Sequence, residues 1–143
     1  MAMLRLTGGG PRPDSAARHA GPPRPPTGAG LAITEYDPRP AAVREARAQV
    51  RGRLADWGLA DRGELVDTAE LLVSELATNA VLLSTSRFRL TLTLAHGLLR
   101  CEVLGADGAA GGGGMFLVEA LARRWGRHRD RSGTTMWFEL ATE

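Results

Sequence analysis

Apolar residues recur every three or four positions between about residues 64 and 83, and this spacing predicts a long amphipathic helix. At roughly 100° per residue, the positions on one arc are apolar and those on the opposite arc are polar. The apolar arc, which we expect to face a core, contains Leu65, Ala69, Leu72, Val73, Leu76 and Ala80. The solvent arc contains Asp67, Glu70, Ser74 and Thr78.

Glu75 and Asn79 belong to neither arc of this helix. Together with Thr68 they form a separate polar stripe, which Leu71 and Leu82 divide from the solvent arc. A carboxylate and an amide four residues apart project side by side. Burying them without partners would cost a few kcal/mol, so we expect a partner to meet them. The alternative is a helix edge at the rim of the core, where both groups reach water.

The rest of the chain predicts an α+β fold. Residues 31–36 are typical of an edge strand, and Pro38 and Pro40 introduce a helix that Gly58 ends. The apolar face of that helix contains Val43, Ala46, Val50, Leu54 and Trp57. Residues 87–94 and 99–103 alternate as the two strands of a hairpin, and residues 127–140 form another around a turn at 130–133. The order predicts a two-layer sandwich, with three helices on one face of a mostly antiparallel sheet.

A run of four glycines, Gly111, Gly112, Gly113 and Gly114, leads directly into the third predicted helix, residues 115–126. Leu117, Val118, Leu121 and Trp125 recur there at helical spacing, Arg123 and Arg124 suit its C-terminus, and Gly126 is placed to end it. Free N–H groups at such a junction can bind a phosphate, although a glycine run can also be a plain flexible loop. The run lacks the Lys-Ser/Thr of a Walker loop and the strand-glycine-helix order of a Rossmann fingerprint.

Composition narrows the class of protein. The 143 residues suit one domain, all 18 basic residues are arginine, and the net charge is only +2. No helix or hairpin gathers a basic face with interleaved aromatics, so direct nucleic-acid binding is weakly supported. Cys101, the single cysteine, lies in a strand pattern and is interpreted as a core residue. Without an apolar run long enough for a membrane span or a signal peptide, we expect a cytoplasmic protein.

Residues 1–30 differ from the remainder in composition. They are rich in proline, glycine and arginine, which cannot hold a helix or a central strand, and are interpreted as a disordered tail. A start codon chosen too far upstream would also explain them. The predicted domain is therefore 31–143.

Residues 70–81, Glu-Leu-Leu-Val-Ser-Glu-Leu-Ala-Thr-Asn-Ala-Val, resemble the N-box of the GHKL (histidine-kinase-like, Bergerat-fold) ATPases. The version they resemble is that of bacterial anti-sigma factors that are also serine kinases. The likeness extends upstream through residues 40–47 and 54–59 and downstream through 111–125 and 133–140. It covers nearly everything from Leu31 onwards.

The resemblance implies a function and assigns roles to particular residues. Asn79 would bind the Mg²⁺ that bridges the phosphates of ATP, and Glu75 would be the general base. Gly111, Gly112, Gly113 and Gly114, with Met115, would wrap the phosphates, and Thr134 would lie near the adenine. The implied activity is phosphorylation of a serine on an antagonist protein, which controls a sigma factor. Positioning and charge neutralisation are the main requirements of such phosphoryl transfer.

Two departures from the family pattern affect the nucleotide. Gly105 stands where the family places an Asp that hydrogen-bonds the adenine, and Asp107 follows two residues later, displaced by roughly 6 to 7 Å along an extended chain. We include Asp107 among the nucleotide-binding candidates, and the alternative is an ordinary loop residue. The segment 108–110 is also shorter than the usual family lid. Loss of the charge-assisted bond would weaken binding by roughly 1.5 to 3 kcal/mol.

Several further interpretations stay open at this point. A module of the same fold with weak or no nucleotide binding, acting only by protein contact, is the main alternative to the kinase. Leu82 and Leu83 either extend the core or form an apolar patch for a partner or a homodimer. Trp57 and Trp125 are interpreted as core anchors, and the charges from Arg123 to Arg131 as a solvated face with a docking role open. A nucleic-acid binder driven by residues 1–30 would be a third class.

Overall fold

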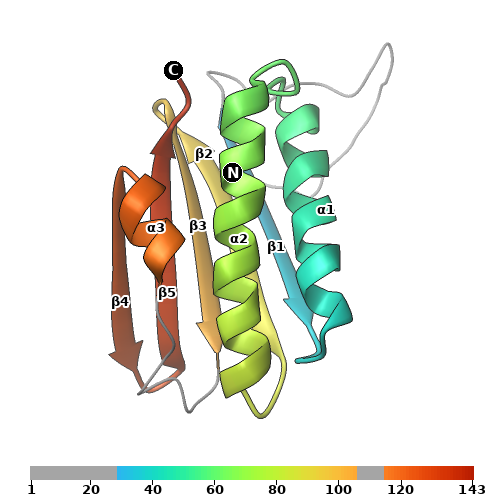
Figure 1. The fold of residues 1–143 in the computed structure, drawn as a ribbon, viewed down its shortest axis with the longest axis vertical. Coiled ribbons are helices and arrows are strands. Elements are labelled where there is room, and N and C mark those ends of the chain that lie inside the picture. Colours follow the sequence, from blue (N-terminus) through green and yellow to red (C-terminus); the bar gives the residue numbers. More distant parts are fainter. Residues whose placement is uncertain (1–28, 106–114) are drawn as a thin grey trace.

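The computed structural model describes residues 29–105 and 115–143. Within them, five strands form one sheet in the order β1-β2-β3-β5-β4, and three helices cover one face of it, as Figure 1 shows. The strands are β1 Gly30–Tyr36, β2 Phe88–Ala95, β3 Leu98–Gly105, β4 Arg124–Asp130 and β5 Gly133–Ala141, and the helices are α1 Ala41–Asp56, α2 Gly63–Leu83 and α3 Phe116–Leu121. All the pairings are antiparallel. The predicted two-layer α+β sandwich is confirmed.

The helical layer forms because α1 and α2 each bury one stripe. The buried residues of α1 are Ala42, Ala46, Val50 and Leu54, four positions apart throughout. Those of α2 are Val66, Ala69, Leu72, Val73, Leu76, Ala77, Asn79 and Ala80. Glu70 and Ser74, expected on the solvent arc, lie beside α1: Arg51 pairs with Glu70, and Arg47 donates to Ser74 Oγ at 3.0 Å. No described helix is long and apolar enough to span a bilayer.

Alternation of apolar and polar residues gives the sheet one buried face. Phe88, Leu90, Leu92 and Leu94 of β2 point to the helices, while the residues between them face the other way. His96 and Gly97 connect β2 to β3 with φ of 54° and 76°, which is the two-residue turn that suits the twist of a hairpin.

The third helix is shorter than predicted. It ends at Leu121, and the residues expected to complete it form the edge strand β4 instead. The backbone N–H of Arg123 donates to the carbonyl of Glu139 at 2.9 Å, so the chain joins the sheet there. Gly126, expected to end the helix, lies in β4 where its backbone passes close to the side chain of Trp137. A Cβ at this position would lie 2.8 Å from the Trp137 indole. Trp125 is 42% exposed, so its interpretation as a core anchor is wrong, whereas Trp57 does pack against the core.

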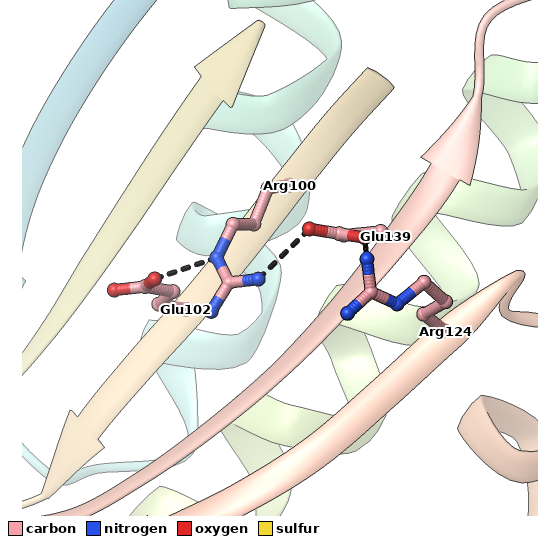
Figure 2. Close-up of polar contacts among 4 residues, drawn as sticks. All are labelled: Arg100, Glu102, Arg124 and Glu139. Carbon is pink, nitrogen blue, oxygen red and sulfur yellow. Dashed lines mark hydrogen bonds and ion pairs between the residues drawn. The ribbon is translucent and has the colours of Figure 1, made fainter.

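The face of the sheet away from the helices has a charged network at its centre. Figure 2 shows Arg100 between two carboxylates, with bonds of 2.7 Å to Glu102 and 2.8 Å to Glu139. Arg124 Nη1 lies 3.5 Å from Glu139, and the Arg100 guanidinium lies 4.0 Å from the Trp137 ring. Partial burial works to lower the pKa of Arg100, but the hydrogen bonds to Glu102 and Glu139 outweigh it and raise that pKa above its usual value.

Candidate functional site

Glu75 connects α2 to the beginning of α3. Its Oε1 accepts a hydrogen bond from the backbone N–H of Val118 at 2.8 Å, and its Oε2 accepts one from Leu117 at 3.1 Å. These are first-turn N–H groups, which have no acceptor inside their own helix. The carboxylate of Glu75 therefore caps α3 from a neighbouring helix, and it faces the segment that follows the glycine run.

Asn79 lies one turn further along α2 and is buried, with 6% of its surface exposed. Its Nδ2 has no hydrogen-bond partner among the described residues. A buried polar group without a partner is costly and rare in native proteins. The rim alternative, in which both polar groups reach water, therefore does not hold for Asn79.

A second buried polar atom without a partner belongs to Thr134, at the start of β5. Thr134 is 2% exposed, and its Oγ1 lacks a partner among the described residues. Its cross-strand neighbour is Gly105, the last residue of β3. Met115, just before α3, is also buried, and Arg127 Nη2 lies 3.7 Å from its sulfur.

Gly105 lies close to a residue that the sequence did not single out. A Cβ on Gly105 would lie 2.6 Å from the hydroxyl oxygen of Ser84, the residue that follows α2. The hydroxyl of Ser84 therefore occupies the space that a side chain at position 105 would enter. Only the tertiary packing of the end of α2 against β3 reveals this pairing, because the two residues are distant in the sequence.

The remaining candidates are not part of the described structure. Asp107 and the glycines Gly111, Gly112, Gly113 and Gly114 lie outside the described residues. The phosphate-binding role of the glycine run and the adenine contact of Asp107 thus remain predictions. Glu75, Asn79, Met115 and Thr134 are the candidates that the structure describes.

A separate groove lies elsewhere on the described part of the chain. It has a volume of about 470 Å³ and lies between the N-terminal end of α2, the end of α3 and the end of β5. Thr68 lines it, but Glu75 and Asn79 do not, and none of the buried atoms that lack a partner belongs to it. The unpaired amide of Asn79 and hydroxyl of Thr134 therefore identify the candidate site better than groove size does.

The fold and the helix that carries Glu75 and Asn79 together define the class: the chain has the histidine-kinase-like (GHKL) ATPase fold. It is similar to the crystal structure of the RsbU and RsbW domains of Rv1364c from Mycobacterium tuberculosis, with a TM-score of 0.66 and 25% sequence identity. The similarity covers 78% of this chain, which spans about a third (32%) of that protein chain. No family model and no curated protein matches the sequence.

Proposed function

We propose that this chain is a regulatory protein of the RsbW type, which binds ATP with Mg²⁺ and phosphorylates a serine on an antagonist protein. The observation that carries the proposal is the buried Asn79 side chain, whose amide nitrogen has no partner among the described residues, one turn beyond a glutamate that faces the start of α3. Through the antagonist it would control a sigma factor. The similarity to an RsbW-containing structure supports this kind of regulator.

The residues present fit a magnesium nucleotide. The Asn79 side chain would present its amide to the metal-bound phosphates, and the Thr134 hydroxyl would contact the adenine. Each of these buried atoms would then gain a partner. When bound, Mg²⁺ neutralises phosphate charge and accepts oxygen ligands, of which one amide oxygen is sufficient from the protein. Glu75 would take the proton of the serine hydroxyl.

Two observations favour a second candidate, a protein-binding module of the same fold with weak catalysis. Both carboxylate oxygens of Glu75 already accept hydrogen bonds from α3, so the group has a structural role that needs no substrate. Gly105 offers no carboxylate to an adenine, and the Ser84 hydroxyl fills the space beside it. In this candidate the chain acts by contact with its partner alone.

Thermal melting with and without Mg-ATP separates the two candidates. Nucleotide at about a hundred times its Kd adds about 2.7 kcal/mol of stability, which raises the melting temperature by several degrees. Asn79→Ala should remove the shift and change the stability without nucleotide by less than about 1 kcal/mol, because it deletes a buried amide nitrogen that has no partner among the described residues. The matched control is Thr78→Ala, an exposed neighbour, which should keep the shift.

The result of the melting experiment decides between the candidates. Absence of a shift in the parent protein at millimolar nucleotide favours the binding module. A full shift in Asn79→Ala contradicts the role of Asn79.

Transfer of phosphate from radiolabelled ATP to a candidate antagonist protein tests the role of Glu75 as the general base. Glu75→Gln keeps an oxygen that can accept from α3 but cannot take a proton, so transfer should fall at least about a hundredfold while the melting shift remains. Glu75→Ala is less informative because it also removes the cap of α3. A Glu75→Gln variant as active as the parent would show that Glu75 is not the base.

A further inference from the structure

The segment from Arg123 to Arg131 has a charge opposite to that of the rest of the described chain. It contains five arginines and one acid, Asp130, whereas the other described residues contain nine arginines and thirteen acids. Nearly all of the segment belongs to β4, where six of the seven residues are exposed. The molecule therefore presents one local basic strand on an otherwise acidic folded body.

The β4 strand is also an edge strand. It is last in the sheet order and, among the described strands, pairs only with β5, as Figure 1 shows, so no described strand lies along its other side. Half of the N–H and C=O groups of an edge strand point outward and can pair with an added strand.

The arginines of the segment from Arg123 to Arg131 are poorly neutralised compared with those elsewhere in the described residues. Among the described residues, Arg123, Arg129 and Arg131 have no ion pair, and Arg127 contacts the sulfur of Met115 rather than a carboxylate. Arg124 shares Glu139 with Arg100. The only acid of the segment, Asp130, is engaged by His128 at 3.2 Å and by the N–H of Ser132 at 2.8 Å.

Exposed apolar side chains accompany these charges. Trp125 within β4 is 42% exposed, and Leu121, which ends α3 just before the strand, is 47% exposed. Trp and Arg are among the residue types enriched in the energetic centres of protein interfaces. The β4 edge thus combines unpaired backbone groups, free arginines and an aromatic anchor.

We infer that the β4 edge is a docking site for an acidic, extended segment of a partner protein, which adds to the sheet as a strand beside β4. The carboxylates of that segment would meet the arginines, and an apolar residue would cover Trp125. A second copy of this chain fits poorly, because pairing two β4 edges would bring arginines against arginines. A long nucleic acid fits poorly as well, since the acidic remainder of the fold repels an extended polyanion. The inference does not depend on nucleotide binding.

The test uses a fluorescent peptide of about eight residues, alternating Glu and Val, and measures its binding to the full chain by anisotropy. The charge-reversal variant is Arg129→Glu with Arg131→Glu. Its matched control is Arg39→Glu with Arg44→Glu, which changes the net charge equally at exposed positions near the start of α1. We expect at least about tenfold weaker binding for the first variant and little change for the second.

Four outcomes would overturn the inference. Equal weakening by both variants would show a net-charge effect without a site. Equal binding of a peptide with Gln in place of Glu would exclude charge pairing. Equal binding of a peptide methylated at alternate backbone nitrogens would exclude strand addition. Tighter binding of a single-stranded oligonucleotide of equal charge would identify the strand as a nucleic-acid surface instead.

Discussion

At the scale of single residues, the space around a glycine decides whether a substitution by alanine stabilises or destabilises the protein. A Cβ on Gly126 would meet three atoms of the Trp137 indole within 2.9 Å, and that ring is held by the guanidinium of Arg100 at 4.0 Å. A Cβ on Gly52, in the middle of α1, would meet nothing within 4 Å. The same substitution should therefore have opposite effects at the two positions.

Gly126→Ala should destabilise the protein by about 1 to 3 kcal/mol, because the indole must shift and part of its contact with Arg100 is lost. Gly52→Ala should stabilise it by up to about 1 kcal/mol, since alanine loses less backbone entropy in a helix. Equilibrium unfolding in urea measures both, with an unchanged m value as the check on two-state behaviour. A Gly126→Ala variant as stable as the parent would mean that Trp137 moves freely.

At the scale of elements, α3 is too short to be stable alone. It has six residues and no side-chain cap from its own N-cap residue, Met115. Isolated helices of this length are marginal in water. Two contacts hold it: Glu75 binds its first N–H groups, and Val118 is fully buried against the core.

Glu75→Ala should therefore loosen α3 specifically. We expect faster hydrogen exchange at the amides of Leu117 and Val118. The free energy of unfolding should fall by about 1 to 3 kcal/mol, the usual cost of unpaired donors. Exchange in α1 should follow only the global change. Thr78→Ala, on the same helix but exposed, is the control. Unchanged exchange at both amides would show that α3 does not depend on this cap.

At the scale of the whole molecule, Cys101 reports on unfolding. It is fully buried in β3, and burial, with a smaller contribution from Glu102, raises the pKa of its thiol far above the usual value. The thiolate that reacts with thiol reagents is therefore scarce in the folded protein at neutral and mildly alkaline pH.

Modification of Cys101 by a disulfide reagent should require opening of the sheet. Its rate should rise with urea in parallel with the unfolded fraction measured by circular dichroism. Rapid labelling in the absence of urea would contradict the packing of β3 beneath α2.

Much of this fold could be predicted from the order of residues, and the errors have a common cause. Periodicity correctly identified α2, the β2–β3 hairpin and the burial of Cys101, because each pattern is local and has one buried face. It failed at residues 122–126, where Trp125 and Gly126 suit the end of a helix. The backbone bond from Arg123 to Glu139 overrides that local preference, and no local pattern reports such a pairing.

The site shows the same division between what the sequence determines and what the fold decides. The sequence by itself determined that Glu75 and Asn79 share a stripe, because side chains four residues apart on a helix are neighbours on its surface. Only the tertiary structure decided that Glu75 caps α3, that the Asn79 amide is buried without a partner, and that Ser84 fills the space beside Gly105. These contacts join residues far apart in the chain, and their existence depends on how the layers pack rather than on the spacing of neighbours.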